Sequence, residues 1–158
     1  MQLGSTRRRG YVRALRSRPL LCSANRAIAA VQDIKSIERT ELKADRVEVF
    51  PESPAAGTYA VTGHFARVPW RSQFAYRLHP TGFHSAKVRG ERPQGWDISG
   101  GFVVAPLGER ACLVVHYEDY GLPRYLAPLR GLIRLYLQRS MEAELRALAE
   151  MVAGEPVP

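Results

Sequence analysis

The feature that most constrains the fold is a long amphipathic stretch near the C-terminus, residues 122–153. Apolar residues recur there in steps of three and four, which places them on one side of an α-helix. This apolar stripe consists of Leu126, Leu129, Ile133, Tyr136, Leu137, Met141, Leu145, Leu148 and Met151. The opposite side of the helix carries Arg130, Arg134, Arg139, Glu142, Glu144 and Arg146. Because the preceding segments have the pattern of strands, the helix is expected to bury its stripe on a sheet.

Most of the chain before this stretch alternates apolar and polar residues, the pattern of half-buried β-strands. Strands are predicted over residues 11–18, 47–50, 58–66, 70–79, 82–88, 97–105 and 111–120. The turns between most of them have hairpin length, which predicts an antiparallel sheet with one face for the core and one for water. A strongly bent sheet that curls around the long helix satisfies all of these elements.

Proline, glycine and serine residues mark the boundaries of the predicted elements. Pro19 interrupts the first strand, and Ser23 is placed to cap a short helix over Ala24–Gln32. The pair Gly100–Gly101 predicts a bulge or a strong bend in the sixth strand. Pro128 belongs in the first turn of the long helix, so regular helix is expected to begin at the residue before it.

The 158 residues suit a single domain with an ordinary core. We expect this domain to span residues 9–153, between a basic flexible arm at 1–8 and a flexible tail at 154–158. Cys22 and Cys112 form no CxxC pattern, so both are interpreted as small buried residues in a reducing compartment. No apolar run approaches the length of a membrane span, and no apolar segment follows the basic start, so a cytoplasmic location is expected.

The net charge of +8 favours anionic partners. Arginine supplies nearly all of the positive charge, because only Lys35, Lys43 and Lys87 are lysines. A cluster of arginines near the start leaves open a module that binds RNA, a ribosome or a protein: Arg7, Arg8, Arg9, Arg13, Arg16 and Arg18. Against nucleic acid, aromatic and basic residues do not interleave as they do on single-strand stacking platforms.

The sequence lacks the motifs of the common catalytic and cofactor sites. It has no glycine-rich phosphate loop, no GxSxG elbow and no HxH or HExxH spacing. His64, His84 and His116 could form a metal site only if their strands pair suitably, and no carboxylate pattern completes such a site. No metal and no cofactor is therefore predicted.

The order of elements, together with several local motifs, resembles the START-like superfamily (the SRPBCC group). This group includes polyketide cyclases, coenzyme Q-binding proteins and lipid-transfer proteins. The resemblance covers roughly 130 residues and is carried by Cys22–Ala24, Val61–Phe65, Ile98–Phe102, Leu113–Glu118 and Tyr120–Pro123. It implies an α+β helix-grip fold, in which a curved antiparallel sheet of about six or seven strands wraps around the C-terminal helix and encloses a cavity.

One segment departs from the pattern of this group. Members often carry a second short helix and a Trp-rich segment after the first helix, whereas Asp33–Glu41 contains no aromatic residue. The mouth of the cavity on that side is therefore expected to be more open, or built differently.

Aromatic residues of one strand parity are expected on the concave side of the sheet. They are Tyr59, Phe65, Trp70, Phe74, Tyr76 and Phe102. Each of them alone could be ordinary core, but as a set they favour a large apolar ligand. From the helix, Leu129, Ile133, Tyr136 and Leu137 are expected to touch this ligand, while the stripe from Met141 onward closes the core.

His116 and Glu118 share one face of the last strand. If that face points inward, burial shifts their pKa values toward use in acid–base catalysis, and otherwise they are a solvated or strand-end pair. The leading function is binding, with transport as an extension, of a hydrophobic small molecule or lipid, and His116 joins the ligand-binding residues. A polyketide cyclase or dehydratase with His116, Glu118 and Tyr76 as catalytic candidates stays open, as does the interaction module.

Overall fold

The computed structural model describes residues 11–65, 67–88 and 96–154, apart from the side chain of Phe65. The predicted basic arm at 1–8 lies outside these residues, and so does the predicted tail apart from Gly154. None of the helices in these ranges has the length and apolar character needed to cross a membrane.

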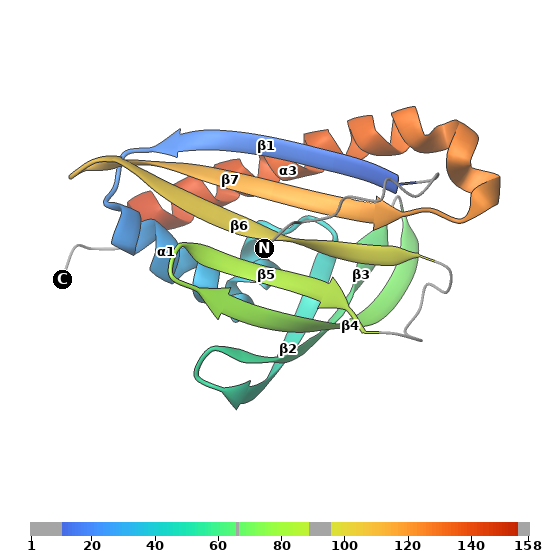
Figure 1. The fold of residues 1–158 in the computed structure, drawn as a ribbon, viewed down its shortest axis with the longest axis horizontal. Helices are drawn as coiled ribbons and strands as arrows, with labels where there is room; N and C mark the ends of the chain where they lie inside the picture. The colour runs from blue at the N-terminus through green and yellow to red at the C-terminus, as the bar shows by residue number, and fades with distance from the viewer. Residues whose placement is uncertain (1–10, 66, 89–95, 155–158) are drawn as a thin grey trace, which may run out of the picture.

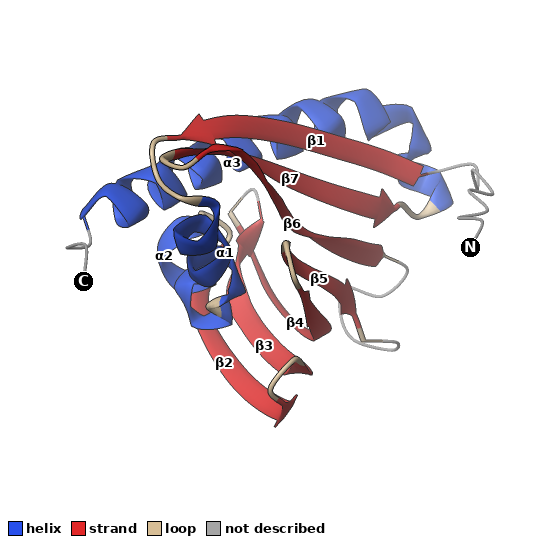
Figure 2. Cartoon of the chain, turned by 60° about the vertical axis from the view of Figure 1, so that its left-hand side comes forward, coloured by secondary structure: helices blue, strands red, loops and turns tan. Residues whose placement is uncertain are grey.

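The described residues form a seven-stranded antiparallel sheet, which confirms the predicted class. Its strands are β1 (Tyr11–Leu20), β2 (Ala44–Ser53), β3 (Ala56–Phe65), β4 (Val68–His79), β5 (Gly82–Lys87), β6 (Asp97–Gly108) and β7 (Ala111–Gly121). Their order in the sheet is β1-β7-β6-β5-β4-β3-β2, so that β2 to β7 form a meander and the N-terminal strand pairs with the last one. The sheet bends strongly from β1 to β2 (Figures 1 and 2).

The helices lie between the strands and after them. They are α1 (Ala24–Gln32), the 3₁₀ turn η1 (Ile34–Ser36), α2 (Ile37–Thr40), the 3₁₀ segment η2 (Arg124–Leu129) and α3 (Arg130–Gly154). The predicted short helix has the observed bounds of α1, and the Ser23 hydroxyl accepts a hydrogen bond from the backbone N–H of Arg26 at 3.3 Å, as an N-cap does. A second short helix, α2, follows even though its segment contains no aromatic residue.

α3 covers only one half of the concave face, because it runs alongside β1 (Figure 2). Its buried residues pack in two clusters, one with β1 and the end of β7, and one with α1, β6 and β7. These helix residues are Leu137, Met141, Leu145, Leu148 and Val152. The other half of the sheet, β2 to β5, has its own cluster with η1 and α2, centred on Val47, Tyr59, Val61, Phe74 and Phe83. This division leaves space between the two halves of the core.

Three local predictions differ from the structure. β1 continues through Pro19 to Leu20. Proline is tolerated in this strand because β1 lies at the edge of the sheet, where backbone N–H groups on the open side have no neighbouring strand to bond. A bulge or a strong bend was predicted at Gly100–Gly101, and the bulge is wrong, because the β6–β7 ladder runs past this pair without a register shift. Pro128 lies in η2, and the α-helix begins at Arg130, three residues later than expected.

Gly101 is explained by close backbone approach. A Cβ atom at this position would overlap the carbonyl oxygen of Phe83 on the neighbouring strand β5. Only a residue without a side chain lets the two strands pair at this point.

We expect Gly101→Ala to lower the free energy of unfolding by at least about 2 kcal/mol, since strand backbones would have to separate. Gly131→Ala is the matched control, because a Cβ atom there meets nothing within 4 Å and the position is in α3. The control should raise the free energy of unfolding by about 0.5–1 kcal/mol through helix propensity. Urea unfolding measures both changes, and equal effects would contradict the account of Gly101.

Candidate functional site

A cavity of about 370 Å³ lies between strands β3 to β7, α2 and α3. Its walls are mainly apolar and aromatic, and its polar groups gather at one end. The lining residues are Ile37, Thr40, Glu41, Lys43, Tyr59, Val61, Val68, Pro69, Trp70, Phe74, Phe83, Ser85, Trp96, Ile98, Ser99, Gly100, Gly101, Phe102, His116, Glu118, Tyr120 and Glu144. The volume falls within the range of small-molecule sites.

Strand alternation builds the aromatic wall. Tyr59 of β3 pairs with Phe74 of β4, and their rings stack with centroids 5.3 Å apart. Trp70 meets Phe74 edge to face at 6.4 Å. The Tyr59 hydroxyl donates to Ser85 Oγ at 3.0 Å, so this ring is fixed from both ends. The result is a rigid, flat surface that suits a ring or an extended apolar chain.

Lys43 is the centre of the polar end. It lies between α2 and β2, it is only 3% exposed, and it lines the cavity. Its ammonium group is 3.2 Å from Glu118 Oε1, 3.3 Å from Glu41 Oε1 and 3.7 Å from Glu144 Oε1. One buried cation therefore lies within 4 Å of three carboxyl groups from three separate elements.

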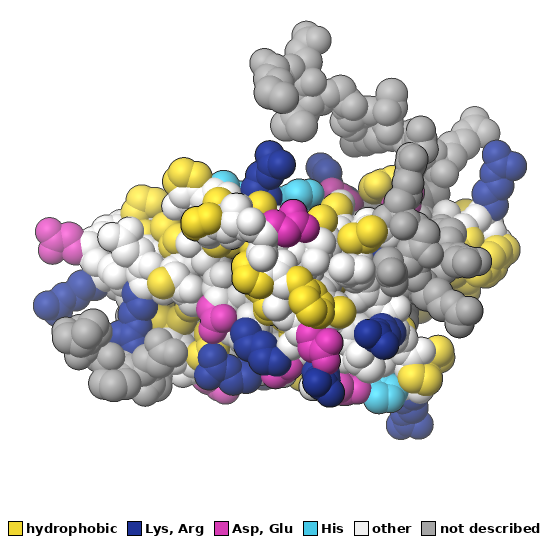
Figure 3. Space-filling model, turned by 90° about the horizontal axis from the view of Figure 1, so that it is seen from below, with side chains coloured by type: hydrophobic (Ala, Val, Ile, Leu, Met, Phe, Trp, Pro, Cys, Tyr) yellow, Lys and Arg dark blue, Asp and Glu magenta, His cyan; other side chains and the backbone are white. Residues whose placement is uncertain are grey.

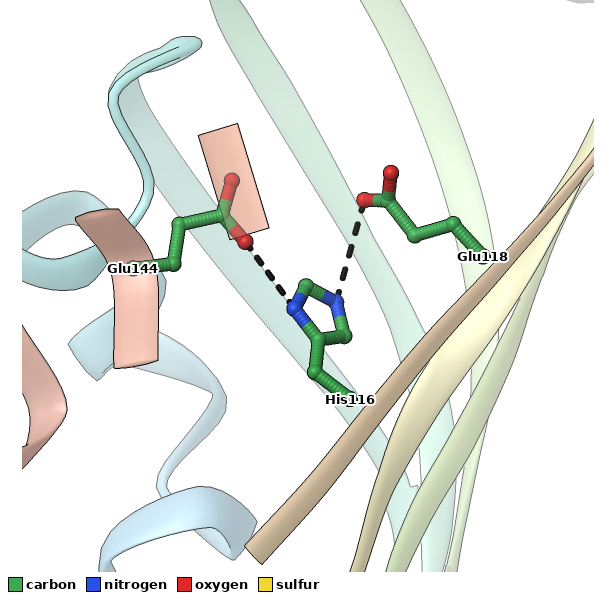
Figure 4. A group of neighbouring side chains, drawn as sticks. All are labelled: His116, Glu118 and Glu144. Carbon is green, nitrogen blue, oxygen red and sulfur yellow. Dashed lines mark ion pairs between the residues drawn. The ribbon is translucent and has the colours of Figure 1, made fainter. Parts of the chain in front are cut away.

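The imidazole of His116 lies between Glu118 and Glu144 (Figure 4). Its Nε2 is 3.8 Å from Glu118 Oε1, and its Nδ1 is 3.2 Å from Glu144 Oε2. The second pair is close but is not aligned as a hydrogen bond, so Nδ1 is buried without a hydrogen-bond partner among the described residues. The ring stacks on Phe102 at 4.1 Å, which fixes its plane.

The lysine and Glu118 form the ionised pair of the cluster. Burial alone would lower the pKa of Lys43, but the carboxylate of Glu118 and the other anionic groups outweigh it and raise that pKa well above its usual value. Burial likewise opposes ionisation of Glu118, but the Lys43 ammonium holds the pKa of that carboxyl below its usual value. Both groups therefore carry their charge at neutral pH.

Glu144 and His116 are shifted toward their neutral forms. Burial raises the pKa of Glu144 from 4.5 to about 8, although Lys43 opposes that shift. The hydroxyl of Ser140, one turn earlier on α3, donates to Glu144 Oε1 at 2.8 Å. Burial lowers the pKa of His116 from 6.5 to about 4, against the effect of Glu118. At neutral pH the site thus combines a neutral imidazole, a carboxylic acid, an ammonium and a carboxylate.

His116, Glu118 and Glu144 each place one ligating atom within 4.8 Å of the others, a spacing that a divalent ion can use. Lys43 already supplies a positive charge at this place, and a second cation there would be repelled. The three histidines do not meet: His64 pairs with Asp45, and His84 stacks on Tyr117 across the other face of the sheet. The donor set therefore favours ion pairing over a metal.

No protein-family model matches the sequence, and no curated protein matches it either. Solved structures do match the fold. An aromatase/cyclase, Zhui from Streptomyces sp. R1128, aligns over 90% of this chain and 94% of its own with a TM-score of 0.76 and 13% identity. The START-like helix-grip fold is therefore the fold of this chain.

Two further solved structures with this START-like fold are similar to the chain, and only one of them is named as an enzyme. A START superfamily protein from Mycobacterium smegmatis aligns over 90% of this chain and 97% of its own, with a TM-score of 0.71 and 12% identity. Norcoclaurine synthase from Thalictrum flavum aligns over 92% of this chain and 96% of its own, with a TM-score of 0.68 and 12% identity. At these identities the likeness concerns the fold alone.

The START-like fold brings part of the predicted site together. The cavity is lined by Tyr59, Trp70, Phe74, Phe102, His116 and Glu118. Tyr76 is buried in the β2–β5 cluster instead, and its hydroxyl lies close to Gly57. The side chain of Phe65 lies outside the described part of the structure.

The predicted helix wall lies elsewhere in this START-like fold. Leu129 is exposed, Leu137 is fully buried, and Ile133 and Tyr136 pack beside it against β1 and β7. Of the described α3 residues, Glu144 alone lines the cavity. The difference arises because α3 runs beside β1, so its first turns never face β2 to β5.

Sequence reasoning missed Lys43 and Glu144. The first is one of three lysines in a chain that otherwise uses arginine, which was a visible but unspecific signal. Glu144 was assigned to the polar side of the helix, yet it is only 2% exposed. It lies three residues after Met141 and four before Leu148, so helical spacing also permits a place on the apolar stripe.

We expect Glu144→Gln to flatten the pH dependence of stability between pH 6.5 and about 8. In this window the unfolded chain has released the Glu144 proton while the folded chain retains it, so the wild-type free energy of unfolding falls as the pH rises. Glutamine cannot ionise and removes this slope. His116 acts in the opposite direction below pH 6.5, outside the window.

The measurement is urea unfolding at several pH values in that window. Glu142→Gln is the control, because this neighbouring carboxylate is exposed and pairs with Arg16 on the surface. Parallel slopes for wild type and Glu144→Gln would show that Glu144 is not held protonated in the folded chain.

Proposed function

We propose that the chain binds a hydrophobic small molecule that carries oxygen atoms at one end. The main support for this proposal is the cavity of about 370 Å³, which has an aromatic wall and a polar end at Lys43. An entirely apolar ligand would leave four buried polar side chains facing hydrocarbon, which is costly. A ligand with a carbonyl, phenol or carboxyl group at one end matches both surfaces.

Two unpartnered buried atoms support an oxygen-bearing ligand. Trp70 Nε1 and His116 Nδ1 lack hydrogen-bond partners among the described residues, and both residues line the cavity. A buried polar atom without a partner costs about 1–3 kcal/mol. An acceptor oxygen on the ligand would recover part of that free energy at the indole N–H.

We expect Val61→Phe to weaken binding of the aromatic probe anilinonaphthalene sulfonate at least about tenfold, which corresponds to about 1.4 kcal/mol. Val61 lines the cavity and is 2% exposed, so a phenyl ring there occupies ligand space. Thr62→Phe places the same ring on the opposite, exposed side of β3 and should leave binding unchanged. Fluorescence titration gives both dissociation constants.

Native mass spectrometry of the purified protein, followed by solvent extraction, identifies any ligand that co-purifies. Absence of both a bound mass and probe binding would refute the proposal. Equal weakening by Val61→Phe and Thr62→Phe would place the probe outside the cavity.

A second candidate function, acid–base catalysis of the cyclase or dehydratase type, is favoured by the position of His116 between two carboxyl groups and beside Lys43. A neutral imidazole can take a proton from the carbon next to a ligand carbonyl, and the electron pair of that C–H bond then moves to the carbonyl oxygen. The Lys43 ammonium stabilises the resulting enolate. The protonated carboxyl group of Glu144 returns a proton.

We expect the chain to accelerate deuterium uptake next to the carbonyl of the aromatic ketone tetralone in heavy water, followed by NMR. His116→Gln should reduce the rate by about 100-fold or more, whereas His84→Gln, on the other face of the sheet, should not. The rate should rise above pH about 4, where His116 is a free base, and fall above about 8, where Glu144 ionises. Unchanged exchange in His116→Gln would leave binding alone as the function.

The interaction alternative receives less support from the surface. Arg13 pairs with Asp119 at 2.6 Å and Arg16 with Glu142 at 2.7 Å, so two of the six N-terminal arginines are already neutralised. On the face in Figure 3, basic and acidic side chains are interspersed. Such a face lacks the continuous basic stripe that nucleic acid prefers.

A further inference from the structure

The start of the C-terminal helical segment is apolar on two sides. Its inner side, with Leu126, Ile133 and Tyr136, packs against the cluster that contains the cavity residue Tyr120. Its outer side exposes Tyr125 by 76%, Leu129 by 46%, Leu132 by 67% and Leu135 by 46%. We call these four residues the outer stripe. The steps from Leu129 to Leu132 and Leu135 are of three residues, so these side chains lie on one face.

An exposed stripe of this kind is unusual for a surface helix. A helix that packs on a sheet normally presents polar residues to water, and a large apolar patch on the surface marks an interaction site. The outer stripe belongs to η2 and the first turns of α3, which lie at the margin of the molecule, in orange in Figure 1.

The positive charges around the outer stripe indicate an anionic partner. Between Asp119 and Glu142 the chain contains four arginines and no acidic residue. All four are exposed, and Arg124, Arg130 and Arg134 are the three closest to the outer stripe in the sequence. None of these three forms an ion pair with another described residue. Leucine and tyrosine side chains bordered by arginines are typical of segments that lie in the interface of an anionic lipid bilayer.

We propose that the outer stripe docks the chain on an anionic lipid bilayer. The four side chains of the outer stripe enter the boundary between headgroups and acyl chains, and Arg124, Arg130 and Arg134 contact lipid phosphates. Docking does not depend on what the cavity holds. It would bring the cavity wall at Tyr120, which the inner side of the same segment covers, close to the bilayer.

The test is flotation of the full chain with vesicles of phosphatidylcholine alone and with vesicles in which about one third of the lipid is phosphatidylglycerol. We expect binding to the anionic vesicles that weakens as salt is raised. The double variant Leu132→Gln, Leu135→Gln should reduce partitioning at least about tenfold through lost apolar burial. The double variant Arg130→Gln, Arg134→Gln should reduce it by a similar factor through lost headgroup attraction.

A matched control removes the same residue types elsewhere. Leu107 is 60% exposed at the β6–β7 hairpin, next to the exposed Arg110, so Leu107→Gln, Arg110→Gln should bind vesicles like wild type. Because all of these positions are exposed, thermal unfolding and probe binding should be unchanged in every variant. A failure of probe binding would therefore refute the proposed function and leave docking untouched.

Three outcomes would overturn the docking proposal. The first is wild-type protein that does not float with anionic vesicles at low salt. The second is full binding by Leu132→Gln, Leu135→Gln combined with loss of binding when Arg7, Arg8 and Arg9 are replaced by glutamine, which assigns binding to the N-terminal arginines. The third is a dimer in sedimentation velocity that the same leucine variant dissociates, without vesicle binding, which assigns the stripe to a second copy of the chain.

Discussion

The buried ammonium of Lys43 is the interaction on which the polar end of the cavity depends. Three carboxyl groups, from the turn after α2, from β7 and from α3, come within 4 Å of it. Without this cation, Glu118 would be a buried anion with no counter-charge, and breaking such a pair is strongly destabilising. The lysine therefore ties α3 to the sheet at the one place where the helix meets the cavity, and it holds the neighbouring groups in different protonation states.

The cavity itself follows from a mismatch between sheet and helix. The sheet bends over seven strands, while α3 lies along β1 and fills only the nearer half of the concave face. The farther half is covered by η1, α2 and aromatic side chains that pack on one another. Tyr59 and Phe74 thereby serve both as core and as cavity wall.

α3 has two separate tasks along its length. Its second half buries Leu145, Leu148 and Val152 and closes the core. Its first half contacts β1 and β7 on one side and presents leucines to solvent on the other. Glu144 lies between the two halves and is the residue of α3 that lines the cavity. Proposed ligand binding and proposed docking thus use different residues of one element.

The class of fold, most of the strands, the first helix with its Ser23 cap, and the position of His116 and Glu118 on one strand face were all predictable from the sequence. Periodicity and turn composition encode these features locally, because side chains alternate in strands and repeat every three or four residues in helices. Which half of the sheet α3 covers depends on packing between distant elements, and this packing keeps Leu129 to Leu137 away from the cavity. The tertiary structure alone also brought Lys43 to Glu144, about 100 residues away, since ion pairs between distant elements leave no periodic trace in a sequence.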